Sequence, residues 1–283
     1  MRAVRPKPKG EETLKHLKIN GYDMAYLELG QGPPLLLLHG SLCDFRIWGP
    51  VLGPLSQCHR VIAPSLRHFF PAQWNGIGEG FTIAQHVADV IGFIEALGPG
   101  QIDLLGHSRG GHIAFRVAQQ RPDLLRKLVL AEPGGDLDAT LDPSVASAAP
   151  SPLASRIAIS AEKIARGDID GALQNFCDGI DGDGAWARLP AAPRQQLRDN
   201  VFTLLGQVGE NRKPYSKADA QAIRTPTLLI GGGETQGALS QIWRVLAEHM
   251  PDARTAVIPG ARHWMFEQAP EAFCKIVLAF LAG

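Results

Sequence analysis

The stretch Gly106-His107-Ser108-Arg109-Gly110 decides the fold of this chain. It follows an apolar run at residues 102–105, which is typical of a buried strand, and precedes a segment with helical periodicity that begins near Arg109. A G-x-S-x-G pattern between a strand and a helix indicates a sharp turn, in which glycines make room and the serine hydroxyl stands at the carboxyl edge of a sheet. The free N–H groups of the following helix favour negative charge nearby. The pattern therefore predicts that Ser108 is a nucleophile.

The rest of the chain alternates short apolar runs with longer amphipathic segments, as expected for a largely parallel sheet with crossover helices. The opening differs, because Asn20-Gly21 separates residues 16–19 from 22–29 and predicts an antiparallel hairpin. A helix is predicted at residues 82–97, with Thr82 as its N-cap. Further strands are predicted at 34–38, 60–63, 127–131, 227–230 and 255–258, and further helices at 241–250 and 271–281.

The composition changes after Pro133. Residues 135–224 are rich in alanine, proline and short polar runs, with amphipathic pieces at 153–165 and 194–205. We expect this stretch to form a helical cap inserted into a core domain made of residues 1–134 and 225–283. A chain of 283 residues is long enough to bury one such core without a disulfide or a metal.

Composition also excludes several classes of protein. The 28 lysines and arginines balance 28 aspartates and glutamates, which argues against a nucleic acid or an anionic membrane as partner. No apolar run reaches the roughly eighteen residues of a membrane span, and the start of the chain lacks the apolar core of a secretion signal. The four cysteines form no C-x-x-C pair, which favours buried thiols in a reducing compartment. We expect a cytoplasmic protein that binds a small-molecule substrate and uses no metal or cofactor, with a homodimer left open.

A serine nucleophile needs a base, which in this topology lies later in the chain. Of nine histidines, His263 is late and in a loop before the last helix, whereas His249 falls within an amphipathic helix. The carboxylate that would orient His263 has two candidates. Glu132 ends the strand before the expected cap, and Glu234 lies in the loop after the next strand. We favour Glu132 and keep Glu234 as the alternative.

Acyl transfer also requires N–H donors for the oxyanion. The predicted donors are the amide of Arg109, which follows the nucleophile, and the amide of Ser41 in the loop at residues 39–43, with Leu42 as the neighbouring alternative. His39 is predicted to brace this loop. Candidates for the substrate pocket are Leu42, His107, Arg67, His68, Trp74 and Trp264. Arg67, His68 and Trp74 could equally anchor the cap.

These motifs together resemble the α/β-hydrolase fold. His39-Gly40 follows the third strand, Ser108 occupies the nucleophile elbow, and His263 lies in a Gly-Ala-x-His loop before the final helix. The resemblance covers nearly the whole chain and implies an eight-stranded, mostly parallel sheet, a cap after strand six, and hydrolysis without a cofactor. The chain departs from the family at Thr235, where most members keep an aspartate. Relatives such as haloalkane dehalogenases, which place the acid after strand six, make Glu132 a reasonable replacement.

The sequence therefore predicts a serine hydrolase that cleaves an ester or a lactone through an acyl-enzyme, with a Ser108–His263–Glu132 triad. A serine at the elbow, rather than an aspartate, argues against dehalogenase and epoxide hydrolase chemistry. Two enzymatic alternatives use the same triad, namely hydrolysis of a carbon–carbon bond and peracid formation as in cofactor-free haloperoxidases. An alternative of another class is a receptor that holds a small ligand on the hydrolase scaffold.

Overall fold

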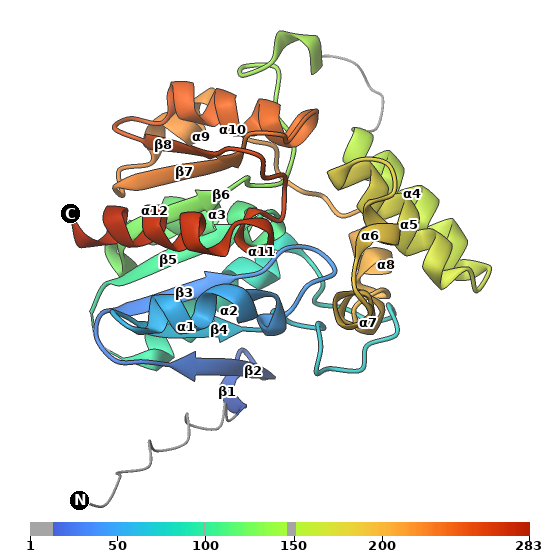
Figure 1. Ribbon diagram of the computed structural model, residues 1–283, viewed down its shortest axis with the longest axis horizontal. Helices are drawn as coiled ribbons and strands as arrows, with labels where there is room; N and C mark the ends of the chain where they lie inside the picture. Colours follow the sequence, from blue (N-terminus) through green and yellow to red (C-terminus); the bar gives the residue numbers. More distant parts are fainter. Residues whose placement is uncertain (1–13, 99, 146–150) are drawn as a thin grey trace, which may run out of the picture.

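The computed structural model describes residues 14–98, 100–145 and 151–283. Its described residues form an eight-stranded sheet in the order β1-β2-β4-β3-β5-β6-β7-β8 (Figure 1). The pairs β1–β2 and β2–β4 are antiparallel, and the other neighbouring pairs are parallel. The prediction of a mostly parallel α/β sheet is confirmed. The strands are β1 Lys15–Ile19, β2 Tyr22–Leu29, β3 Pro34–Leu38, β4 Arg60–Pro64, β5 Ile102–His107, β6 Leu125–Ala131, β7 Thr227–Gly232 and β8 Arg254–Ile258.

The first two strands form the predicted hairpin. Asn20 and Gly21 have φ angles of 47° and 75°, and they connect Ile19 and Tyr22, which are partners in the strand register. Two successive positive φ angles are the requirement of a type I′ turn, whose twist matches that of the paired strands. Because Asn and Gly tolerate this conformation, the two residues specify the turn locally.

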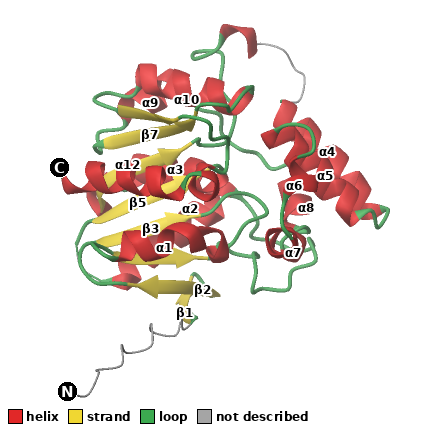
Figure 2. Cartoon of the chain, viewed as in Figure 1, coloured by secondary structure: helices red, strands yellow, loops and turns green. Residues whose placement is uncertain are grey.

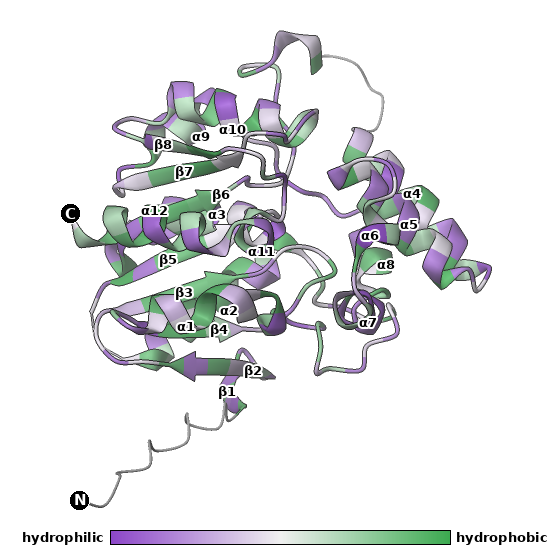
Figure 3. Cartoon of the chain, viewed as in Figure 1, coloured by the Kyte–Doolittle hydropathy of each residue, from purple (hydrophilic) through white to green (hydrophobic). Residues whose placement is uncertain are grey.

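Leucines of β3 contribute to both faces of the sheet. Leu35 and Leu37 belong to a core packed under α1 and α12, whereas Leu36 and Leu38 belong to a second core under α2, α3 and α10. A strand covered on both faces has no polar side, which explains its uninterrupted apolar sequence. Figure 3 shows hydrophobic residues along the central strands.

The helices that flank the sheet lie on its two faces (Figure 2). Thr82 caps α2 as predicted, with its side chain accepting from the amide of Gln85. Among the described residues, every helix is too short or too polar to span a bilayer. The flanking helices are α1 Gly49–Ser56, α2 Ile83–Leu97, α3 Arg109–Gln120, α9 Lys217–Ala222, α10 Ala238–His249, α11 Met265–Gln268 and α12 Pro270–Ala282, and short 3-10 turns occur at Phe45–Trp48, Pro122–Leu124 and Pro143–Val145.

Five of the six described α-helices between β6 and β7 gather beyond one side of the sheet and are here called the helical segment (Figure 1). The amphipathic piece at residues 194–205 is divided between two helices, because α7 ends at Asp199 and α8 begins at Thr203. Asn200 breaks the helix, since its buried side chain bonds to other parts of the molecule. The domain boundaries at 134/135 and 224/225 stay a prediction. The five helices are α4 Pro152–Ala165, α5 Ile169–Asp181, α6 Ala185–Arg188, α7 Ala191–Asp199 and α8 Thr203–Gln207.

Candidate active site

Ser108 stands in a strained turn between the end of β5 and the start of α3. Its φ and ψ angles are 52° and −118°, a conformation that side-chain-bearing residues rarely adopt. The two glycines of the pattern are required because neighbouring backbone atoms leave no room for a side chain at either position. A Cβ atom on Gly106 would lie 2.3 Å from the carbonyl oxygen of Gly110, and one on Gly110 would lie 2.2 Å from the carbonyl oxygen of Leu38. The elbow that the sequence predicts is therefore present, with its hydroxyl at the carboxyl edge of the sheet.

The chain after β6 holds this elbow from the neighbouring strand. The Ser108 amide donates to the carbonyl of Ala131 at 3.1 Å, and the Ser108 carbonyl accepts from the amide of Gly134 at 2.9 Å. Glu132 lies between these two contacts and has a φ of 41°. A positive φ at a non-glycine residue persists only where the surroundings fix it. The Glu132 carboxylate is thus held at the same edge of the sheet as the Ser108 hydroxyl.

Glu132 and His263 form a buried hydrogen-bonded pair. One carboxylate oxygen, Oε2, lies 2.7 Å from Nδ1 of His263, and the other, Oε1, accepts from the amide of Gly232 at 2.7 Å. A carboxylate is an acceptor, so this contact assigns the proton to Nδ1 and leaves Nε2 with a free lone pair. The arrangement suits His263 for accepting a proton at Nε2, and it places the charge of Glu132 where an imidazolium would form.

The loop that carries His263 is held by the end of α5. The side chain of Asp181 accepts from the His263 amide at 3.1 Å and from the Gln268 amide group at 3.3 Å, and its carbonyl accepts from Arg262 at 2.8 Å. Burial raises the pKa of Asp181, and the bond from the His263 amide opposes that rise. Sequence reasoning missed Asp181, because the contact joins residues 82 positions apart and no local pattern marks it.

His107 supports the same loop from the nucleophile side. Its Nε2 lies 2.9 Å from the carbonyl of His263, and the two rings are 4.4 Å apart between centroids. Burial holds the pKa of His107 well below its ordinary value, so the ring is neutral and Nε2 carries the donated proton. Gly40 approaches the other side of this ring, because a Cβ there would lie 3.1 Å from Nδ1.

The loop after β3 brings a second backbone segment to Ser108. A Cβ atom on Gly40 would lie 3.1 Å from the Cβ of Ser108, which shows how closely the loop passes Ser108. Leu42 has a φ of 62°. The amide of Cys43 closes the turn by donating to the Gly40 carbonyl at 3.3 Å. Within the described chain, the amides of Ser41 and Arg109 donate to no protein acceptor. Both amides are therefore available to a ligand.

Ser108 and His263 line the same cavity of about 240 Å³. Its base is formed by the elbow and by Gly40 and Ser41, and its opposite wall comes from α4 and α5 of the helical segment and the start of α10. His107 and Trp264, both predicted as pocket residues, also line it. The remaining residues of the wall are Arg109, Gly134, Gly135, Pro152, Leu153, Arg156, Phe176, Gly179, Ile180, Arg212, Gln236, Gly237, Ala238, Leu239 and Ile242.

Residues 35–276 match the model of the alpha/beta hydrolase family. The chain belongs to this family. Among curated proteins, this α/β hydrolase is 29% identical over 278 residues to the 2-hydroxymuconate semialdehyde hydrolase of Pseudomonas putida, covering 93% of this chain and 92% of that protein. It is 24% identical over 301 residues to the soluble epoxide hydrolase of a Corynebacterium species, covering 96% and 98%. A thermophilic esterase from Thermogutta terrifontis has the same fold, with a TM-score of 0.76, 24% identity, and 95% and 98% coverage.

Three predicted pocket residues of this α/β hydrolase lie outside the lining of the cavity. The Arg67 guanidinium binds Asp89 at 2.7 Å, and His68 stacks on Trp74 with 4.5 Å between the ring centroids. The Trp74 ring lies against Gly206 of α8, where an added Cβ would come within 2.7 Å of it. The placement fits the second alternative, contact with the helical segment. The sequence shows that these residues follow β4, but not that an ion pair and a stacked ring turn them away from the cavity.

Two further candidates from the sequence, Leu42 for the pocket and Glu234 for the carboxylate, lie outside the cavity lining and outside the side-chain contacts of His263, respectively. The Leu42 side chain is 1% exposed and belongs to the hydrophobic core rather than to the cavity wall. Glu234 is exposed and makes no side-chain hydrogen bond within the described residues, whereas Glu132 is in contact with His263. No group of three potential metal ligands gathers in the part of the chain that the structure describes.

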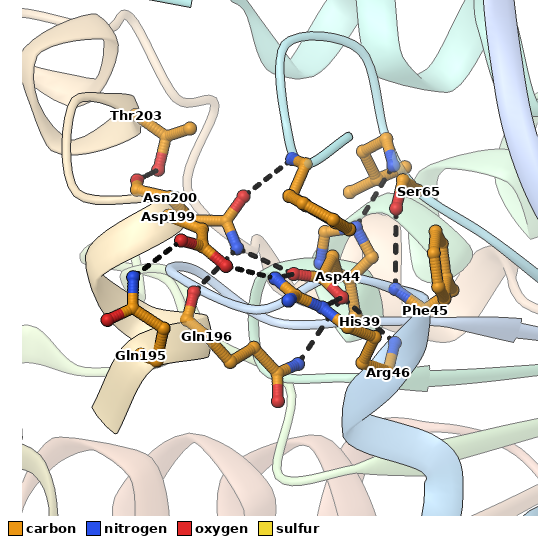
Figure 4. Close-up of polar contacts among 12 residues, drawn as sticks. His39, Asp44, Phe45, Arg46, Ser65, Gln195, Gln196, Asp199, Asn200 and Thr203 are labelled. Carbon is orange, nitrogen blue, oxygen red and sulfur yellow. Dashed lines mark hydrogen bonds and ion pairs between the residues drawn. The ribbon is translucent and has the colours of Figure 1, made fainter. Parts of the chain in front are cut away.

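A buried polar cluster ties the loop after β3 to α7 (Figure 4). Asp44 accepts from the Arg46 side chain at 2.7 Å and from Asn200 Nδ2 at 2.7 Å. Arg46 also binds Asp199 at 2.9 Å, and Asn200 Oδ1 accepts from the amide of Phe70 at 2.7 Å. His39 braces the loop as predicted, because its Nε2 accepts from the backbone amide of Leu66 at 3.0 Å. The cluster therefore fixes the loop that presents Ser41 to the cavity.

Proposed function

We propose that this α/β hydrolase cleaves a carboxylic ester or a lactone through an acyl-enzyme. The observation that carries the proposal is the 2.7 Å hydrogen bond between Glu132 and His263 beside a cavity that both His263 and Ser108 line. A serine, a histidine with a free Nε2 and a buried carboxylate are the groups that acyl transfer needs.

In the proposed reaction, Ser108 Oγ attacks the carbonyl carbon while His263 Nε2 takes the hydroxyl proton. Glu132 stabilises the resulting imidazolium, and the amides of Ser41 and Arg109 bind the oxyanion. The tetrahedral species then collapses, the carbon–oxygen bond to the alcohol breaks, and His263 returns the proton to that alcohol. Water attacks the acyl-enzyme with His263 again as base, which frees the acid and restores Ser108.

A second candidate is hydrolysis of a carbon–carbon bond on the same residues. It is favoured by the similarity to the 2-hydroxymuconate semialdehyde hydrolase, which extends over 93% of this chain. The name of the other curated relative, an epoxide hydrolase, fits less well, because a serine rather than an aspartate occupies the elbow. The esterase from Thermogutta terrifontis shares the fold of this chain, and this similarity does not distinguish ester hydrolysis from the other reactions.

The test combines a covalent probe with a substrate panel. A fluorophosphonate should label the wild type, and Ser108→Ala should lose labelling and about three or more orders of magnitude in turnover of short p-nitrophenyl esters while keeping the wild-type melting temperature. Normal turnover in the variant would refute the mechanism. Parallel assays of lactones, of a vinylogous 1,5-diketone and of peracid formation separate the reaction classes. Labelling of Ser108 without turnover of any of these compounds would favour the receptor instead.

A further inference from the structure

The cavity beside Ser108 has a one-sided distribution of charge. Its wall contains three arginines, Arg109, Arg156 and Arg212, and no aspartate or glutamate among the described residues that line it. Apolar side chains of α4, α5 and α10 occupy much of the remaining wall, including Leu153, Phe176 and Ile242. An apolar cavity with a few charged groups fixes the orientation of a ligand through those groups. The charged groups here are all cationic.

Two of the three arginines have a protein partner. Both terminal nitrogens of Arg109 donate to Glu210, at 2.8 and 2.7 Å, and Arg212 donates to the same carboxylate at 2.9 Å and to Gln207 at 3.2 Å. Burial alone would raise the pKa of Glu210, but the bonds from Arg109 and the charge of Arg212 hold it below its ordinary value. Glu210 is therefore ionised and partly neutralises this pair.

Arg156 differs from both. It lies on α4, and its Nη1 atom is buried without a hydrogen-bond partner among the described residues. The guanidinium lies against Gly179 of α5, where an added Cβ would overlap Nη1 at 1.2 Å. Arg156 and Asp178 also line a second cavity, and the Asp178 carboxylate accepts from the amide of Trp186 at 2.9 Å. Nη1 of Arg156 thus has no carboxylate partner within the described chain, and burial lowers the pKa of the guanidinium.

An unpaired guanidinium facing a partly enclosed cavity is unfavourable unless an anion binds there. Its planar fork of N–H donors matches a carboxylate, which can accept two parallel hydrogen bonds. A side chain at position 179 would occupy the place of Nη1, so this glycine lets the guanidinium pack against α5 at the wall of the cavity. A substrate with an apolar stretch between its reactive carbonyl and a carboxylate would place each group against a matching wall.

We propose that Arg156 binds a free carboxylate of the substrate, so that the enzyme acts on esters or lactones that carry a second, ionised acid group. This specificity rests on the proposed function, and it names a residue outside the triad and the oxyanion loop. Arg156 contributes to binding rather than to the chemical step. Its removal should therefore affect anionic substrates and spare neutral ones.

The first experiment compares a half-ester with a neutral ester of the same acid. The substrates are the p-nitrophenyl monoester of adipic acid and its methyl p-nitrophenyl diester. In Arg156→Gln, kcat/KM for the monoester should fall about tenfold to a hundredfold, mainly through KM, while kcat/KM for the diester stays within about twofold. Arg156→Lys should recover part of the loss. Arg166→Gln, at the exposed end of the same helix, serves as the matched control and should behave as the wild type.

The second experiment measures binding without turnover. Monomethyl adipate and dimethyl adipate are titrated calorimetrically into Ser108→Ala and into Ser108→Ala with Arg156→Gln. The monoester should bind the first protein at least about tenfold more tightly than the second, and the diester should not distinguish them. Equal binding of the monoester, or loss of the preference on Arg212→Gln but not on Arg156→Gln, would overturn the proposal. If the monoester binds in a way that depends on Arg156 but the wild-type enzyme hydrolyses no ester or lactone, only the proposed reaction is refuted.

Discussion

Replacing Glu132 by glutamine keeps the size of the side chain and removes one of its two acceptors. In the wild type, Oε1 accepts from the Gly232 amide and Oε2 from His263 Nδ1, each at 2.7 Å. A glutamine has one oxygen and one NH₂ group, so one of these two donors would face another donor. The Gly232 amide cannot change its proton, whereas His263 can move its proton to Nε2 and accept at Nδ1. The variant therefore favours the tautomer that has no lone pair toward Ser108.

We expect kcat of Glu132→Gln to fall about 10³- to 10⁴-fold, the size of effect known when a triad acid becomes an amide. This corresponds to about 4 to 5.5 kcal/mol of transition-state stabilisation. The assay is steady-state hydrolysis of a short p-nitrophenyl ester, with the circular dichroism spectrum as a check of folding. Glu234→Gln is the matched control and should stay within about twofold, because Glu234 is exposed. A loss below tenfold in Glu132→Gln, or a larger loss in Glu234→Gln, would refute the assignment of the acid.

Two further predictions concern stability. Asn200→Ala removes a buried side chain that bonds to Asp44 and to the Phe70 amide, and it should lower the free energy of unfolding in urea by about 2 to 4 kcal/mol. Gln174→Ala, at an exposed position of α5 outside the cluster, should change it by less than about 0.5 kcal/mol, and equal effects would contradict the role of the cluster. Burial, with the charge of Asp181, raises the pKa of Glu267 from 4.5 to about 7, so the folded state holds this proton more tightly and loses stability as the pH rises through that interval. Glu267→Gln should therefore match the wild type at pH 4 and exceed it by up to about 3 kcal/mol at pH 8, and a variant that is less stable at pH 8 would reverse the sign.

The features that sequence reasoning predicted are those that a few adjacent residues determine. The glycines around Ser108 are needed because other atoms occupy the space of their side chains, and Asn20-Gly21 supplies the two positive φ angles of the first turn. Such signals are local and do not depend on the rest of the fold. The apolar strands could be predicted for a similar reason, since a strand covered on both faces needs no polar side.

The features that were missed depend on pairs of residues far apart in the chain. Asp44 and Asn200 are separated by 156 positions, and their contact both anchors the loop after β3 and ends α7. No periodicity in either segment contains that information, and the amphipathic pattern at 194–205 does not mark the break at Asn200. Arg67 shows the same limit, because its partner Asp89 lies on α2 and turns it from the cavity. Tertiary contacts override local pattern in these cases.

The contacts of Glu132 show how sheet topology places a carboxylate beside His263. Ala131 and Ile230 are register partners in the adjacent strands β6 and β7, so Glu132, one residue later, lies beside the end of β7. There the Gly232 amide donates to its carboxylate. A side chain at Gly232 could not be accommodated, because its Cβ would lie 2.6 Å from the carbonyl oxygens of both residues that precede His263 in the loop. Gly232 and Glu132 are therefore two parts of one arrangement: the glycine lets the backbone approach the histidine loop, and the glutamate accepts from that backbone while its other oxygen lies against the imidazole.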